Sequence, residues 1–133
     1  MAERQLKSHF TEHLGIDVHF MKDGKSEMSL PMKPEFNNSG GMAHGGVIAS
    51  LADSVAGGAA FSTVGIEKMA VTTDFNLCFM RASWGDSLFA HGEVIHGGKQ
   101  FIRVAVEVFC DDTLVATAGV SFQVIDRPKP LEP

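Results

Sequence analysis

Tyrosine is absent from this 133-residue sequence, tryptophan occurs once and cysteine only twice. The two cysteines, Cys78 and Cys110, lie far apart between apolar neighbours, so the chain lacks the disulfide framework of a small secreted domain. Residues 1–7 contain no apolar core and do not form a secretory signal. We therefore expect reduced thiols and a cytoplasmic protein.

Positive charge is also scarce, because 11 Lys and Arg residues stand against 16 Asp and Glu residues, giving a formal net charge of −5. No cluster of basic residues forms the face that nucleic-acid binding requires. The longest nearly uncharged stretch, residues 36–66, contains Asp53 and repeated glycines, which excludes a membrane span. Neither a nucleic acid nor a membrane is an expected partner.

Hydrophobic periodicity divides the chain into elements of a single domain over residues 1–133. It predicts a helix at about 3–14, a hairpin of strands 16–20 and 28–32, a loop at 33–43, a long helix at about 44–63, four strands at 69–80, 86–96, 101–110 and 114–125, and a proline-rich tail at 127–133. The long helix consists largely of small and apolar residues, so it must be buried. This order favours an α+β fold, with a curved antiparallel β-sheet wrapped around one long central helix.

The long helix carries one polar stripe. Ser50, Asp53, Ser54 and Gly57 are spaced i, i+3, i+4 and i+7 and therefore share a face. Asp53 is the only charged residue between Val47 and Phe61. A carboxylate in an apolar segment is either a catalytic group, or a structural one that lies on a solvated stripe or is paired with a distant arginine, and the residues around Asp53 favour neither interpretation.

Glycines at the start of the same helix indicate a second functional feature. Two residues without side chains, Gly45 and Gly46, follow His44 and present backbone N–H groups at the positive end of the helix dipole. Such donors bind a carbonyl oxygen or an oxyanion. No Gly-Lys-Ser/Thr sequence follows, so the segment is not a phosphate-binding P-loop.

Asn38, His44-Gly45-Gly46 and Asp53, taken together, resemble the signature of hotdog-fold acyl-CoA thioesterases. The pattern is similar to the PaaI-like (phenylacetate-degradation) branch of the 4-hydroxybenzoyl-CoA thioesterase superfamily. The similarity covers roughly residues 14 to 125 and continues through the stretches 71–77, 85–90 and 114–118.

The resemblance implies hydrolysis of an aryl- or medium-chain acyl-CoA to the free acid and CoA, with active sites at a homodimer interface. Gly46 would polarise the thioester carbonyl through its N–H, and the partner's Asp53 would act as general base or as nucleophile. Asn38 would position water or the carbonyl, His44 would shape the loop, and Thr72 would orient the water. A second subunit is also required because Asp53 lies too far along its own helix to face the helix start.

The same resemblance suggests how the substrate is held. Basic residues near strand ends would meet the CoA phosphates, although a solvated surface position is the favoured interpretation of any single one of them. The candidate binding residues are Gly45 and Phe61, the basic residues Arg81, Lys99 and Arg103, and the further pocket residues Phe36, Met69 and Phe75. No metal and no cofactor is expected, since CoA is part of the substrate, and the assembly is a homodimer or a homotetramer.

Two other functions remain compatible with the sequence. The first is a non-catalytic acyl-CoA-binding hotdog module. The second is a hotdog dehydratase or hydratase, although those enzymes use a catalytic His with an Asp or Glu at a different spacing. Cys78 and Cys110 have no neighbouring base, and Ser50 and Ser54 lie in no Gly-x-Ser-x-Gly elbow, which excludes thiol and serine nucleophiles.

Overall fold

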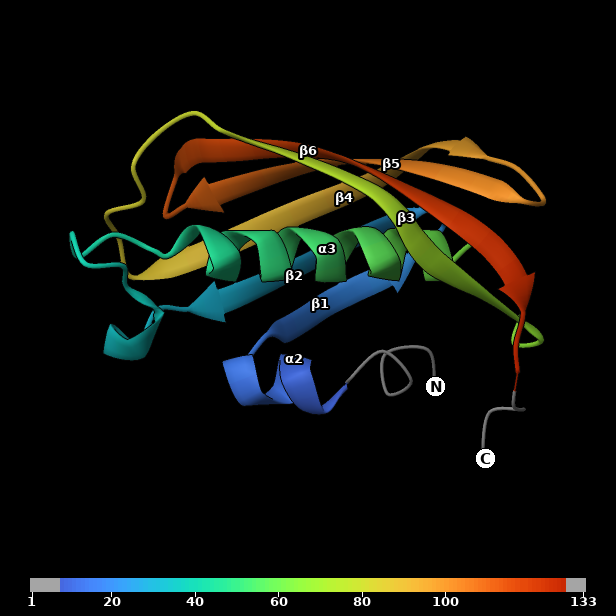
Figure 1. Cartoon of the computed structure of the whole chain (residues 1–133), viewed down its shortest axis with the longest axis horizontal. Helices are drawn as coiled ribbons and strands as arrows, with labels where there is room; N and C mark the ends of the chain where they lie inside the picture. The colour runs from blue at the N-terminus through green and yellow to red at the C-terminus, as the bar shows by residue number, and fades with distance from the viewer. Residues whose placement is uncertain (1–7, 129–133) are drawn as a thin grey trace.

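The computed structural model describes residues 8–128. Its elements are α2 (His9–Leu14), β1 (Asp17–Lys22), β2 (Lys25–Pro31), η1 (Pro34–Phe36), α3 (Gly45–Phe61), β3 (Lys68–Phe79), β4 (Ser87–Gly97), β5 (Phe101–Cys110) and β6 (Thr113–Asp126). The strands form one antiparallel sheet in the order β1-β2-β4-β5-β6-β3. The sheet curves around α3 (Figure 1), as the sequence predicts.

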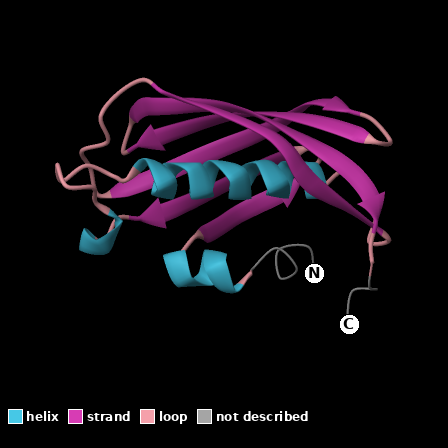
Figure 2. Ribbon diagram, viewed as in Figure 1, coloured by secondary structure: helices cyan, strands magenta, loops and turns pink. Residues whose placement is uncertain are grey.

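The core lies between α3 and the inner face of the sheet (Figure 2). Alternate residues of β5 point toward the helix, so Ile102, Val104, Val106 and Val108 are buried. Small residues let the backbones approach closely: a Cβ added at Gly92 would lie 3.2 Å from the carbonyl oxygen of Val55. The prediction that α3 is buried is therefore confirmed.

The boundaries of the helices differ slightly from the predicted ones. Helix α3 begins after His44, which is its N-cap, and ends at Phe61 rather than at 63. The hydroxyls of Ser62 and Thr63 donate to the carbonyl oxygens of Ala59 and Ala60 at 2.7 and 2.8 Å, satisfying acceptors at the helix end. The first predicted helix is α2, and its proposed start at residues 3–7 lies outside the described residues.

Two segments predicted to be irregular are more ordered than expected. The loop at 33–43 contains the short helix η1 and a bridge between Asn37 and Ala43. Arg127, placed at the start of the departing tail, is held against the chain: its side chain donates to the carbonyl oxygens of Ile66 and Lys68 at 3.1 and 3.2 Å. These contacts join the end of β6 to the start of β3.

Strand β3 lies at one edge of the sheet and contains a bulge. Its register against β6 shifts between Thr72 and Asp74. Thr72 pairs with Phe122 and Phe75 with Val120, whose side chains are both buried, so Thr72 and Phe75 point toward α3 although they are three residues apart. Met69 lies on the opposite face of the strand, which contradicts its predicted place in the acyl pocket.

Within residues 8–128, no helix combines the length and the apolar character that crossing a membrane requires.

Candidate active site

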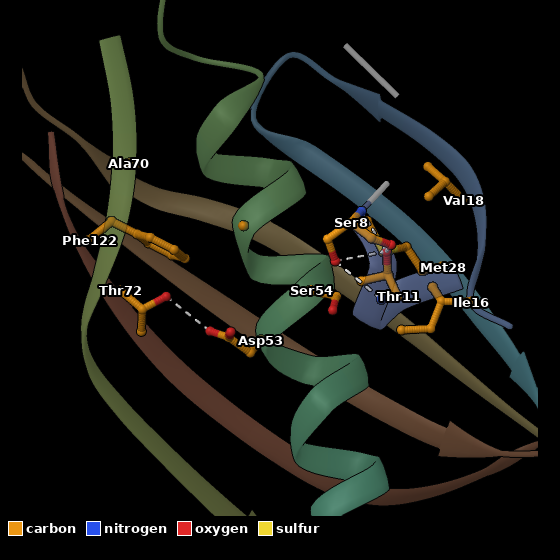
Figure 3. A pocket seen from close by; sticks show the side chains of 11 residues that line it. Ser8, Thr11, Ile16, Val18, Met28, Asp53, Ser54, Ala70, Thr72 and Phe122 are labelled. Carbon is orange, nitrogen blue, oxygen red and sulfur yellow. Dashed lines mark hydrogen bonds between the residues drawn. The ribbon is translucent and has the colours of Figure 1, made fainter. Parts of the chain in front are cut away.

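Asp53 lies on the one polar face of α3. Its neighbours Ala52, Val55 and Ala56 are buried, whereas Asp53 is exposed. The Thr72 hydroxyl donates a hydrogen bond to Asp53 Oδ1 at 3.0 Å (Figure 3). Asp53 is therefore exposed and accepts from Thr72, whereas Ser50, Ser54 and Gly57 of the same face are half-buried. The structure brings these two predicted catalytic residues together from an inner helix and an edge strand.

Two cavities meet at Asp53 and Thr72. One has a volume of about 330 Å³ and the other of about 480 Å³, and Ser8, Thr11 and Ser54 line both of them. The first extends over an apolar surface formed by Ile16, Val18, Met28, Gly57, Ala70 and Phe122. The second is bounded by Phe10, Ala49, Ser50 and Phe75. Phe75 thus lines the space beside Asp53, as predicted.

Helix α2 contributes residues to this site that the sequence did not reveal. Ser8 and Thr11 line both cavities, and Figure 3 places them across α3 from Thr72. They form a capping box, in which the Thr11 N–H donates to Ser8 Oγ at 3.2 Å and the Ser8 N–H donates to Thr11 Oγ1 at 3.0 Å. The capping pattern could have indicated a helix start, but only the tertiary fold places it beside Asp53.

The start of α3 is organised by its N-cap. His44 Nδ1 accepts a hydrogen bond from the Gly46 N–H at 2.9 Å. In a neutral imidazole the accepting nitrogen carries no proton, so Nε2 is then the protonated nitrogen. The Gly46 N–H thus has an internal acceptor here, and it would have to be shared with, or released to, a thioester carbonyl.

Asn38 fixes the loop that precedes the helix. Its Oδ1 accepts from the N–H groups of Gly40 and Met42 at 2.8 and 3.1 Å, which leaves its amide N–H₂ as the donor for a ligand. Asn38, Gly45 and Arg81 line a cavity of about 260 Å³. Arg81 is exposed and donates to the carbonyl oxygen of Leu114 at 2.9 Å.

The predicted site is thus divided into two parts on one helix. We call Asn38, His44, Gly45, Gly46 and Arg81 the loop half-site, and Asp53 and Thr72 with their two cavities the carboxylate half-site. Gly46 and Asp53 are separated by about 10 Å along the axis, at about 1.5 Å per residue. A general base must lie within about 3 Å of the group whose proton it takes, or act through one water molecule. The two half-sites of one chain are too far apart for this, so they do not form a complete site.

Three other predicted binding residues lie away from both half-sites, whereas the carbonyl oxygen of Phe36 accepts from the His44 N–H of the loop half-site at 2.8 Å. Phe61 is the last residue of α3, and Lys99 lines a cavity of about 520 Å³ beside Thr63, after the end of that helix. Phe36 is buried in the core. Arg103 donates to Ser121 Oγ at 2.7 Å, on the sheet face opposite to α3.

Residues 40–117 match the thioesterase superfamily model, and this range contains Asp53, Thr72 and every residue of the loop half-site except Asn38. The chain belongs to the thioesterase superfamily. The six-stranded antiparallel sheet around one long helix is the hotdog fold of this superfamily. The protein is a thioester hydrolase, as the resemblance of the Asn38, His-Gly-Gly and Asp53 pattern implied.

Individual members show how far the likeness extends. A candidate esterase of Saccharolobus solfataricus is 31% identical over 116 residues, which cover 87% of this chain and 82% of that protein. A Bacillus halodurans protein whose crystal structure was solved with CoA is 31% identical, has a TM-score of 0.84, and is matched over 94% of this chain and 83% of its own.

The PaaI protein of the Escherichia coli phenylacetic acid degradation operon shares the fold. Its TM-score is 0.82 at 24% identity, with coverage of 92% of this chain and 88% of that one. At this identity the likeness concerns the fold alone, so membership of the PaaI-like branch stays a prediction.

Proposed function

We propose that the protein hydrolyses an aryl- or medium-chain acyl-CoA to the free acid and CoA. The observation that carries this proposal is the position of Asp53, which is exposed, hydrogen-bonded to Thr72 and located where two cavities with apolar walls meet. A reactive carboxylate beside an apolar cavity suits an acyl group that occupies the cavity with its carbonyl carbon next to the carboxylate. The CoA bound to the Bacillus halodurans relative supports the choice of CoA as the thiol.

The proposed active site contains both half-sites, each from a different subunit of a homodimer. Strand β3 supports this arrangement because it is a 12-residue edge strand with mostly exposed residues and carries Thr72. An edge of this length offers unpaired N–H and C=O groups to a second copy. A two-fold axis through paired β3 strands would create two equivalent sites, and a tetramer of two such dimers is compatible with this proposal.

The reaction then follows from the charges of the two half-sites. The thioester carbonyl develops negative charge at its oxygen, which the Gly46 N–H and the positive end of α3 stabilise. The partner's Asp53 takes a proton from water, whose oxygen bonds to the carbonyl carbon as the C–S bond breaks and the proton passes to the departing sulfur. Asn38 and Thr72 position the carbonyl and the water, and no metal or cofactor takes part.

Asp53 can alternatively attack the carbonyl carbon itself, so that the C–S bond breaks, CoA departs as a thiolate that takes a proton from solvent, and a mixed anhydride remains that water hydrolyses. A single turnover in H₂¹⁸O with excess enzyme detects the nucleophilic route when water attacks the anhydride at the Asp53 carboxyl carbon. General-base catalysis places ¹⁸O in every acid product. Nucleophilic attack followed by hydrolysis at the Asp53 carboxyl carbon leaves the first product unlabelled and places ¹⁸O in Asp53, which mass spectrometry of the digested protein detects.

Basic residues are the candidates for binding the CoA phosphates. Arg81 lies in the loop half-site and can meet a phosphate, whereas Lys99 lies beyond the other end of α3 and would have to serve the partner's site. Replacing Arg81 with Ala should raise KM for acyl-CoA more than it lowers kcat, because the CoA phosphates are remote from the reacting carbon. A cytoplasmic location also stays a prediction from the sequence.

The test is a thiol-release assay with phenylacetyl-, hydroxybenzoyl- and straight-chain acyl-CoAs. Replacing Asp53 with Ala should lower kcat roughly 10²- to 10⁴-fold, the usual contribution of a positioned general base. The matched control is Asp112→Asn, an exposed carboxylate in the turn between β5 and β6. Equal activity of the Asp53→Ala and wild-type proteins would refute the mechanism. No thiol release but a raised melting temperature with acyl-CoA would indicate a binding module.

A further inference from the structure

We propose that Gly57 determines which acyl groups the protein accepts, by leaving open the path from Asp53 into the 330 Å³ cavity, and that the preferred acyl groups end in an apolar ring or chain. This inference rests on the proposed function, and it concerns the carboxylate half-site alone.

Gly57 lies one helical turn beyond Asp53 on the same face of α3. Both residues line the 330 Å³ cavity, and Val18 of β1 and Ala70 of β3 line it too. An acyl group whose carbonyl carbon stands at Asp53 therefore passes over Gly57 as it enters this cavity. A side chain at position 57 would occupy that path.

The neighbouring glycine, Gly58, shows what a packing requirement looks like. A Cβ at Gly58 would lie 2.6 Å from Ser26 Oγ and 2.9 Å from the sulfur of Met21, so this residue must be small for α3 to touch β1 and β2. Among residues 8–128, a Cβ at Gly57 would meet nothing within 4 Å. Gly57 is in a helix and does not have a positive φ. Neither packing nor backbone geometry requires glycine at 57, although glycine weakens a helix interior.

The volume of the cavity is suited to an aryl or medium-chain group. It measures about 330 Å³, whereas a cavity of about 150 Å³ is sufficient for benzene. The space thus exceeds the need of a single ring and has room for a linker between the ring and the carbonyl.

The hydroxyl groups that line the cavity already donate hydrogen bonds within the protein. Thr72 donates to Asp53, and Ser54 donates to the carbonyl oxygen of Ser50 at 2.7 Å. Thr11 donates to the carbonyl oxygen of Ser8 at 3.0 Å, which leaves the Ser8 hydroxyl to donate to Thr11 Oγ1 at 3.3 Å. A polar group at the far end of a substrate would find no free hydroxyl donor here, and burying it would be unfavourable.

The first experiment compares Gly57→Ala and Gly57→Leu with the wild type over straight-chain acyl-CoAs from acetyl to dodecanoyl and over phenylacetyl-CoA. The ratio of kcat/KM for the longest accepted or aryl substrate to that for acetyl-CoA should fall roughly tenfold in Gly57→Ala, and further in Gly57→Leu. Gly65→Ala is the matched control, because a Cβ there also meets nothing within 4 Å but lies outside α3. Unchanged ratios in both Gly57 variants would overturn the inference.

The same series is repeated as a binding measurement in the Asp53→Ala background, by calorimetry with each acyl-CoA. Gly57→Ala should weaken binding of phenylacetyl-CoA relative to acetyl-CoA by a similar factor. This readout does not depend on turnover, so it separates failure of the inference from failure of the proposed function. Equal relative affinities with and without the Gly57 substitution would overturn the inference even in an active enzyme.

The second experiment tests the polarity of the cavity. Phenylacetyl-CoA should exceed 4-hydroxyphenylacetyl-CoA in kcat/KM by roughly 10- to 100-fold, the limit that an apolar pocket imposes on an added hydroxyl. Equal rates, or a preference for the hydroxylated substrate, would show that the far end of the cavity supplies a polar partner and would refute the apolar assignment.

Discussion

The two half-sites lie on the same helix but are built in different ways. Apart from Arg81, the loop half-site is local: Asn38 holds Gly40 and Met42, and His44 holds Gly46, all within nine residues. The carboxylate half-site is assembled from distant segments, since Thr72 reaches Asp53 across 19 positions in the sequence and α2 closes the far side. A local motif can therefore reveal the first half-site, whereas the second depends on how the sheet edges and α2 approach the helix.

The largest expected effect is recovery of activity from two inactive proteins. Asp53→Ala removes the carboxylate half-site, and Gly46→Val places a branched side chain beside the N–H of the loop half-site. In a mixed dimer, one site receives both defects and the other receives neither. Equal co-expression should restore about a quarter of wild-type activity, because half of the dimers are mixed and each has one intact site.

The control for this experiment mixes Asp53→Ala with Asp53→Asn, which share a defective half-site and should recover no activity. Size-exclusion chromatography with light scattering checks that each parent forms the same assembly as the wild type. Failure of the Asp53→Ala and Gly46→Val pair to recover activity in verified mixed dimers would contradict a site that contains half-sites from different subunits.

A smaller loss is expected when only the contact between helix and edge strand is removed. Thr72→Val keeps the shape of the side chain but loses the hydrogen bond to Asp53, and kcat should fall roughly 12- to 150-fold, which corresponds to the range of about 1.5–3 kcal/mol for bonds to charged groups. Thr73→Val is the matched control, because the Thr73 hydroxyl donates to the carbonyl oxygen of Ser121 in the adjacent bulge. Steady-state kinetics on both variants measures the difference, and equal losses would contradict a specific role for Thr72.

The adjacent glycines of α3 should respond to alanine with opposite signs in stability. Gly58→Ala should lower the free energy of unfolding by about 1–3 kcal/mol, because the new methyl group overlaps Ser26 and Met21. Gly57→Ala should raise it by about 0.5–1 kcal/mol through helix propensity. Urea denaturation with unchanged m-values would measure both changes in the free energy of unfolding. Destabilisation by Gly57→Ala would show that other atoms occupy the space into which the new methyl group points.

The smallest effect is expected for a surface pair that touches neither half-site. Hydrogen bonding and charge from Lys68 lower the pKa of the exposed Asp126 carboxyl, so any stabilisation exists above the unfolded pKa and disappears as pH falls through the folded pKa. Lys68→Ala should raise the pKa of Asp126 toward its ordinary value and change neither kcat nor KM. NMR titration of the Asp126 carboxyl carbon provides the measurement, and an unchanged pKa would contradict the pairing.

Sequence patterns located most of the fold because they report burial. The change from helical to alternating periodicity after residue 63 correctly placed four strands, and the small apolar residues correctly predicted an enclosed helix. The bulge beside Thr73 could not be predicted, because its register depends on the partner strand β6. This bulge explains why Phe75 faces the cavity while Met69 faces away.

The sequence alone determined the polar stripe of α3, its glycine-rich start and its burial, because helical periodicity and capping are properties of residues a few positions apart. The tertiary structure decided that Thr72 meets Asp53, that α2 lines the same cavities, and that Gly57 opens onto space while Gly58 is packed. These outcomes depend on strand register and on the approach of distant segments, which the local pattern of one helix does not specify.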